Sequence, residues 1–208
     1  MNKLVIIGAG GQGNVVADIA EKNGYTDIIF LDDNPKAEVC GKYKIVGKCN
    51  SATAHKDGDF IVAIGNARVR RMIQTELADL GLRVVSLVHP SAVIAPNVRI
   101  GTGTVVVAGA VINSNAEIGE GCIINTCASV DHDCRVGDYV HVSVGARVAG
   151  TVTIGSNTMV GAGAVIINNI NIADGCVIGA GATVVKNITE LGTYVGTPAR
   201  KTAYLRRD

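Results

Sequence analysis

The sequence predicts a chain of two folded parts: a Rossmann-like α/β domain over residues 1–87 and a parallel β-helix over residues 88–190, followed by a C-terminal tail over residues 191–208. Three observations support this prediction. A six-residue repeat runs unbroken through the second part. The first part has a glycine-rich loop near its start, and apolar strands alternate with helices along the rest of it.

In the first part, buried strands are expected at residues 4–7, 28–31, 60–64 and 84–87. One apolar-periodic helix follows the glycine loop and ends near residue 23, and a second spans residues 68–80. This alternation is typical of a small parallel sheet, in which the loops at the carboxyl ends of the strands converge on a ligand.

The glycine loop reads Gly8-Ala9-Gly10-Gly11-Gln12-Gly13 and fits the G-x-G-x-x-G fingerprint. An acid, Asp32, lies nineteen residues beyond Gly13. Backbone amides at a helix N-terminus hold a diphosphate, which can belong to NAD or to a nucleotide sugar. Since only half of a dinucleotide fold is present, the smaller ligand is favoured, and the competing interpretation is a tight turn without a ligand.

The second part consists of seventeen consecutive hexapeptides from Val88 to Thr189, each beginning with Ile or Val. A period of six fits neither a helix nor an alternating strand. The fifth residue of most hexads is small, so a large and a small side chain point inward in turn. These small residues are Ala92, Thr104, Ala110, Ala116, Cys122, Ala128, Cys134, Ala146, Thr158, Ala164, Cys176 and Ala182.

The three remaining positions of each hexad hold much Gly, Asn and Asp, which tolerate the backbone angles of turns. Three hexads therefore close a triangular coil of eighteen residues, and about six coils stack on a common core.

Composition excludes several classes of function. The net charge is +1 and aromatic residues make up 3% of the chain, which argues against nucleic-acid binding. No apolar stretch approaches the roughly 20 residues that a membrane helix needs, and the N-terminus resembles a strand rather than a signal peptide. Three of the six cysteines fill inward slots and the others form no CxxC pair, so we expect reduced structural cysteines, no metal, and a cytoplasmic protein.

Two of the four histidines lie in functionally suggestive positions; His55 and His89 are expected to be ordinary loop residues. His132 is the middle residue of a corner between Asp131 and Asp133, and these carboxylates can orient its ring and raise its basicity. A solvated turn histidine is the alternative.

His141 points outward from a strand nine positions after His132, which is half a coil. The two side chains therefore lie on opposite sides of one prism. If they serve one site, that site lies between subunits, and the outward apolar residues Ile123 and Met159 near His141 favour a cyclic oligomer.

Several motifs together resemble the left-handed β-helix sugar acetyltransferases that acetylate nucleotide-linked 4-amino sugars, as in bacillosamine synthesis, or sialic acid. They are Gly8 to Gly13, Phe30-Leu31-Asp32-Asp33, Ala63-Ile64-Gly65-Asn66, Asp131-His132-Asp133-Cys134, His141-Val142-Ser143-Val144-Gly145-Ala146, and Gly196-Thr197-Pro198-Ala199-Arg200.

The resemblance implies a homotrimer with acetyl-CoA in clefts between prisms and a nucleotide sugar held by the N-terminal domain. It assigns His132 as the catalytic base and Asp133 as the acid that enhances its basicity. It places acetyl-CoA near His141, Asn125, Gly150, Ala162 and Ala180. It places the nucleotide sugar near Gly10, Gly11, Gln12, Asp32, Asp33, Gly65 and Asn66. Gln12 stands where relatives often have His, and Asp133 where bacillosamine-pathway enzymes have Glu.

The expected reaction is N-acetylation of a 4-amino sugar by direct attack, with His132 as general base and backbone amides of the neighbouring coil stabilising the oxyanion. An O-acetyltransferase acting on a sugar hydroxyl is the first alternative. A zinc enzyme of the carbonic anhydrase type, an NAD-dependent oxidoreductase and a non-catalytic trimeric scaffold are the others.

Overall fold

The computed structural model describes residues 2–34 and 38–203 and divides the chain into two compact units, Met1–Pro90 and Ser91–Asp208. The first unit ends slightly later than the boundary expected from the start of the repeat. None of the helices that the structure describes has the length and apolar character needed to cross a membrane.

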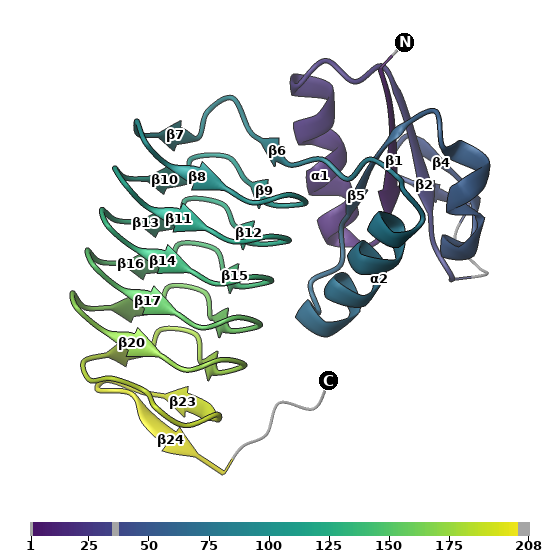
Figure 1. Ribbon diagram of the computed structural model, residues 1–208. Helices are drawn as coiled ribbons and strands as arrows, with labels where there is room; N and C mark the ends of the chain where they lie inside the picture. The colour runs from purple at the N-terminus through teal and green to yellow at the C-terminus, as the bar shows by residue number, and fades with distance from the viewer. Residues whose placement is uncertain (1, 35–37, 204–208) are drawn as a thin grey trace. The chain divides into compact units, whose positions relative to one another are not determined.

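The first unit is built around a sheet with strand order β3-β4-β2-β1-β5 (Figure 1). Its parallel strands are β1 (Lys3–Ile7), β2 (Asp27–Leu31), β4 (Tyr43–Gly47) and β5 (Asp59–Val62). The short β3 (Val39–Cys40) pairs antiparallel with β4. Because β1 lies between β2 and β5, the strand order reverses beside it, and ligands bind at such a point in α/β sheets.

Two α-helices complete this unit, α1 (Gly11–Lys22) and α2 (Ala67–Asp79), together with the 3₁₀ helix η1 (Cys49–His55). The expected strand at residues 60–64 is shorter, and the expected strand at residues 84–87 is reduced to an isolated bridge from Val84 to Phe60 and the two-residue β6 (Leu87–Val88). The segment from β3 to η1 carries no clear periodicity, so its elements were not expected from the sequence.

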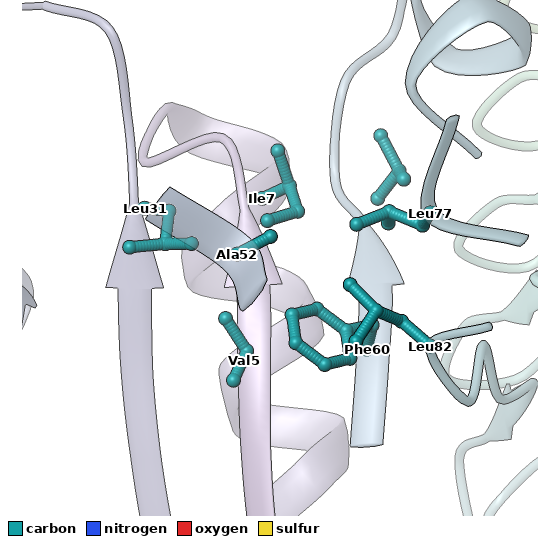
Figure 2. Packing of buried hydrophobic residues seen from close by; sticks show 8 residues of the cluster. Val5, Ile7, Leu31, Ala52, Phe60, Leu77 and Leu82 are labelled. Carbon is teal, nitrogen blue, oxygen red and sulfur yellow. The ribbon is translucent and has the colours of Figure 1, made fainter. Parts of the chain in front are cut away.

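One face of the sheet is packed by side chains from β1, β2, β5, η1 and α2 (Figure 2). This cluster comprises Val5, Ile7, Leu31, Ala52, Phe60, Val62, Leu77 and Leu82. Each fully buried Val, Leu, Ile or Phe side chain contributes about 1.5–3 kcal/mol. The cluster fixes the positions of β1, β2 and β5 in the sheet.

The second unit is a solenoid in which every hexad contributes one two-residue strand, as the repeat predicts (Figure 1). The first face has strand order β22-β19-β16-β13-β10-β7 and the second β20-β17-β14-β11-β8. The third face has the order β24-β23-β21-β18-β15-β12-β9 within this unit. Paired residues are eighteen apart, as in Ile123↔His141 and His141↔Met159.

The first face comprises β7 (Val93–Ile94), β10 (Val111–Ile112), β13 (Ser129–Val130), β16 (Arg147–Val148), β19 (Val165–Ile166) and β22 (Thr183–Val184). The second comprises β8 (Arg99–Ile100), β11 (Glu117–Ile118), β14 (Arg135–Val136), β17 (Thr153–Ile154) and β20 (Asn171–Ile172). The third comprises β9 (Val105–Val106), β12 (Ile123–Ile124), β15 (His141–Val142), β18 (Met159–Val160), β21 (Val177–Ile178), β23 (Thr193–Val195) and β24 (Arg200–Thr202).

The inward positions form the core of this unit. The leading Ile or Val of each hexad from Val106 to Val184 is buried, and so are the small residues from Thr104 to Ala182. Ala92, Ile94 and Ile100 are only partly buried because the first coil closes one end of the stack. The segment expected as a tail contains β23, which pairs parallel with β21, and β24, which folds back antiparallel on β23.

Candidate functional site

The corner between the first and second faces carries His132. Strand β13 ends just before residues 131–133, and β14 begins shortly after them. The corner is therefore held by a strand on each side. The His132 side chain is 53% exposed. It therefore projects from the prism, as the hexad register predicts, and supports no part of the core.

The His132 ring is oriented by Asp133. The His132 Nδ1 lies 2.8 Å from Asp133 Oδ2. Because a carboxylate only accepts, Nδ1 is the donor, and Nε2 of the neutral ring is left as the acceptor. The hydrogen bond to Asp133 raises the pKa of His132, with the charges of Asp131 and Asp133 acting in the same direction against partial desolvation. At this corner, Nε2 of His132 is therefore the ring nitrogen that can accept a proton.

Both carboxylates of the corner are held by asparagines of the preceding coil. Asn113 Nδ2 donates to Asp131 Oδ1 at 2.7 Å, and Asn115 Nδ2 donates to Asp133 Oδ1 at 3.1 Å. Sequence reasoning missed these two residues. The signal was present, because each asparagine precedes its aspartate by one eighteen-residue coil.

On the other side of His132 lies Gly150, one coil further along the chain. A Cβ added at Gly150 would stand 2.5 Å from His132 Nε2 and 2.6 Å from Cε1. Contacts under about 3 Å do not occur for real Cβ atoms, so the ring occupies space that only glycine leaves open. The Gly150 N–H donates no hydrogen bond to any acceptor among the described residues. Gly150 therefore carries a backbone donor without an acceptor in the coil that packs against the His132 ring.

His141 lies on β15 of the third face, opposite the corner that carries His132. The ring Nε2 lies 3.0 Å from Nδ2 of Asn125. Asn125 Oδ1 accepts from the Thr126 N–H, so its amide nitrogen faces His141 and His141 Nε2 is the acceptor. The structure brings together two of the residues expected near acetyl-CoA.

The remaining residues expected near acetyl-CoA fall into two groups. Ala162 and Ala180 are exposed at the corner between the third and first faces, in successive coils on the same side as Asn125. Gly150 belongs instead to the corner of His132. Within one prism, the expected cofactor residues therefore do not form a single surface with His132.

In the first unit, the glycine loop joins β1 to α1 and its glycines have different surroundings. Gly8 has φ +102°, and a Cβ there would meet Ile64 Cγ1 at 2.7 Å. A Cβ on Gly13 would collide with the Gly8 carbonyl oxygen. Gly10 and Gly11 face open space, with nothing within 4 Å of an added Cβ. Packing thus explains Gly8 and Gly13, and leaves Gly10 and Gly11 open to a ligand.

The start of α1 leaves backbone donors available. Gly10 is the N-cap without a side-chain cap, and no acidic residue lies in the first turn of this fully described helix. The first N–H groups of a helix have no partner within it and carry a partial positive charge. Gln12 adds a further donor, because its buried Nε2 has no partner among the described residues.

The two acidic residues that follow β2 accept hydrogen bonds from backbone N–H groups. Asp32 Oδ2 accepts from the Ala9 N–H at 2.6 Å and Oδ1 from the Asn34 N–H at 2.7 Å. Asp33 Oδ1 accepts from the Cys49 N–H at 3.0 Å. Asp32 therefore shapes the glycine loop, a role that the sequence did not reveal.

The loop after β5 is also held in place by contacts with α2, the helix that follows it. Asn66 caps α2 by accepting from the Val69 N–H at 3.1 Å, while Gly65 is exposed with open space around it. Arg70, only 1% exposed, donates from one guanidinium nitrogen to the carbonyls of Ile64 and Gly65 at 2.7 and 2.9 Å. Sequence reasoning missed Arg70, because a charged residue in the second turn of a helix is usually solvated.

All six cysteines are free thiols. Burial raises the pKa of Cys134 and Cys176, both of which fill inward slots. Among the residues that the structure describes, His, Cys, Asp and Glu side chains do not gather in groups of three that could hold a metal ion.

Comparisons with known proteins identify both units. Residues 3–77 match the PglD N-terminal domain, and residues 151–186 match the bacterial transferase hexapeptide repeats. A UDP-N-acetylbacillosamine N-acetyltransferase from Bacillus subtilis is 36% identical over 113 residues, and this match covers 52% of this chain and 52% of that protein.

Solved structures match over nearly the whole chain. The acetyltransferase domain of PglB from Neisseria gonorrhoeae, solved alone and with acetyl coenzyme A, is 38% identical with a TM-score of 0.93, covering 97% of this chain and 100% of that one. A variant of perosamine N-acetyltransferase from Caulobacter crescentus, in complex with CoA and GDP-perosamine, is 34% identical with a TM-score of 0.94, covering 98% of each chain. These matches confirm the resemblance and the fold class predicted from the sequence.

Proposed function

Because this chain belongs to the hexapeptide-repeat acetyltransferases that carry a PglD N-terminal domain, we propose that it transfers an acetyl group from acetyl-CoA to the 4-amino group of a nucleotide-linked amino sugar. The observation that carries this proposal is the His132–Asp133 hydrogen bond at an exposed corner, which leaves Nε2 as a free proton acceptor. The substrate class we favour is a UDP-linked 4-amino-4,6-dideoxy-N-acetylhexosamine.

The chemical step needs one proton acceptor and no covalent intermediate. The neutral amine attacks the thioester carbonyl carbon, His132 Nε2 takes the proton from the nitrogen, and the carbon–sulfur bond breaks to release the CoA thiolate. The protonated His132 returns its proton to this thiolate, so the products are an N-acetyl sugar and CoA. General base catalysis contributes about 10²- to 10⁴-fold to such a step.

Asp133 and Gly150 support this step in different ways. Asp133 holds the ring in the tautomer with Nε2 free and stabilises the imidazolium that forms. The Gly150 N–H, next to the ring, is the donor we assign to the oxyanion of the tetrahedral intermediate.

The N-terminal unit binds the nucleotide in this proposal. Gly10, Gly11 and Gln12 face the diphosphate, because their backbone is open and the helix N-terminus attracts an anion. Asp33, Gly65 and Asn66 lie at the carboxyl ends of the neighbouring strands and contact the nucleoside. Asp32 lies beside them, and its oxygens, which each accept one backbone N–H, keep further lone pairs for the ligand.

The active form we propose is a homotrimer, in which His141, Asn125, Ala162 and Ala180 of one subunit complete the acetyl-CoA site beside His132 of its neighbour. The placement of His132 and His141 on opposite sides of one prism supports this assembly. We place the reaction in the cytoplasm, where acetyl-CoA and nucleotide sugars are both available, as a step in glycan synthesis.

Incubation with acetyl-CoA and a panel of UDP-, GDP- and dTDP-linked 4-amino sugars tests the proposal. We expect CoA release together with a product that has gained one acetyl group on nitrogen, shown by mass spectrometry and NMR. Acetylation on a hydroxyl would identify the O-acetyltransferase instead. Absence of turnover with every amino sugar, when acetyl-CoA raises the melting temperature, would contradict the acceptor class.

A further inference from the structure

We propose that Asn115 is a positioning residue for the His132–Asp133 pair, acting from the coil before it; this inference rests on the proposed function. Asp133 links Asn115 to the His132 ring: its Oδ1 accepts from Asn115 Nδ2 at 3.1 Å and its Oδ2 from His132 Nδ1 at 2.8 Å. The carboxylate is thus fixed by donors at both oxygens, and its plane sets the direction of the imidazole.

The stacking of the coils places Asn115 beside Asp133. Both residues hold the last position of the same corner in successive coils and both have left-handed backbone, with φ +62° and +58°. The backbone is further tied by the Asp133 N–H, which donates to Ser114 O at 3.0 Å. Asn and Asp tolerate this conformation better than other residues with a side chain. The contact is therefore built into the repeat and does not depend on a flexible loop.

The neighbouring asparagine makes a similar contact with a different consequence. Asn113 donates to Asp131 Oδ1, and this same oxygen also accepts the backbone N–H of His132. Asn113 therefore stabilises the backbone of the corner, whereas Asn115 acts on the carboxylate that contacts the ring. Of these two asparagines, Asn115 is the one connected to the His132 ring, through the side chain of Asp133.

The charges around Asp133 make such a restraint useful. Asn115 and Asp133 line a shallow polar hollow of about 360 Å³ together with Asn97, Arg99, Glu117 and Arg135. Either guanidinium could draw an unrestrained carboxylate away from His132, although Arg99 already pairs with Glu117 at 2.9 Å. The hydrogen bonds from His132 and then from Asn115 lower the pKa of Asp133, which keeps it ionised in support of the base.

The test replaces Asn115 by Gly, which removes the amide and keeps the backbone conformation. Asn169→Gly is the matched control, because Asn169 holds the same position of the same corner with φ +61° but lies two coils beyond Asp133. We expect Asn115→Gly to lower kcat by about 3- to 10-fold, the effect of losing the net contribution of one typical hydrogen bond. KM for acetyl-CoA should not change, and the control should match the wild type.

The pH profile separates positioning from a purely structural role. If Asp133 is less well held, His132 loses part of the interaction that raises its pKa, so the acidic limb of kcat moves to lower pH in Asn115→Gly. An unchanged profile, or equal losses in Asn115→Gly and Asn169→Gly, would overturn the positioning role.

The variant His132→Ala, measured alone and combined with Asn115→Gly, separates this inference from the proposed function. We expect the double variant to be no slower than His132→Ala, because Asn115 acts through the ring. A further loss in the double variant would show that Asn115 acts by another route. Near-normal turnover in His132→Ala would instead overturn the proposed base itself.

Discussion

The imidazole of His132 lies directly against the backbone of Gly150 in the following coil, so close that a Cβ at position 150 would be 2.5 Å from Nε2. The His132 ring is therefore bounded on one side by a hydrogen-bonded carboxylate and on the other by a residue without a side chain. This arrangement fixes the proposed catalytic nitrogen in space, and it leads to the first prediction.

Gly150→Ala should displace the His132 ring without unfolding the coil. Gly150 does not have left-handed backbone, so alanine is tolerated there, and the exposed ring can rotate away. We expect kcat to fall by about 10²-fold, the typical effect of a misplacement near 1 Å. Asn168→Ala, at the same corner position one coil further on, is the control for steady-state kinetics. Equal kcat values for Gly150→Ala and the wild type would contradict the role of the contact.

His132→Ala should lower kcat by about two to four orders of magnitude while both substrates still bind. The side chain is exposed and supports no core, so the melting temperature should change little. Ser114→Ala, at the equivalent exposed position of the preceding coil, controls for disturbance of the corner. Thermal-shift titrations with each substrate check that binding survives.

Asp133→Asn should reduce kcat less than His132→Ala and should shift the acidic limb of the rate profile to lower pH. Asn suits the left-handed backbone at position 133, and its amide oxygen can still accept from Nδ1. Removing the negative charge lowers the pKa of His132, so the ring stays unprotonated, and able to act as a base, down to a lower pH. A shift toward higher pH would show that Asp133 does not stabilise the protonated ring.

Gly11→Val should raise KM for the nucleotide sugar by about tenfold or more and leave KM for acetyl-CoA unchanged. An added side chain at position 11 meets open space, so the fold should be preserved, but it blocks the approach of a diphosphate to the backbone. Gly13→Ala is the contrasting variant, because its Cβ would collide with the Gly8 carbonyl and should lower the melting temperature. Equal damage to both KM values by Gly11→Val would argue against the division of substrates between the units.

Co-expression of His132→Ala and His141→Ala chains should restore activity that neither variant has alone. In randomly assembled trimers, about one quarter of the sites would combine an intact His132 with an intact His141 from the neighbouring subunit. Sedimentation should show a trimer in each case. Absence of recovered activity in mixed trimers would indicate that the two histidines do not share a site.

The sequence alone determined the solenoid and the positions of its candidate functional side chains. A strictly periodic coil makes contacts only between neighbouring turns, so position in the hexad decides whether Val142 points inward and His141 outward. The same register put His132 at a corner and His141 on the opposite face. In the N-terminal unit, the strand, glycine loop and helix could be predicted because their signals are local.

Only the tertiary structure decided which of these side chains meet. Asp32 accepts a hydrogen bond from the glycine loop, and Arg70 donates one to the loop after β5. Both bonds join segments whose approach depends on how the sheet is packed. The β3 to η1 segment has no clear periodic signal in the sequence. Its place in the fold is set by the pairing of β4 with β2. The fit of the His132 ring over Gly150 depends on a side-chain rotamer, which hexad position does not encode. The repeat fixed where each residue stands, and the packing of neighbouring coils fixed the direction in which the His132 ring points.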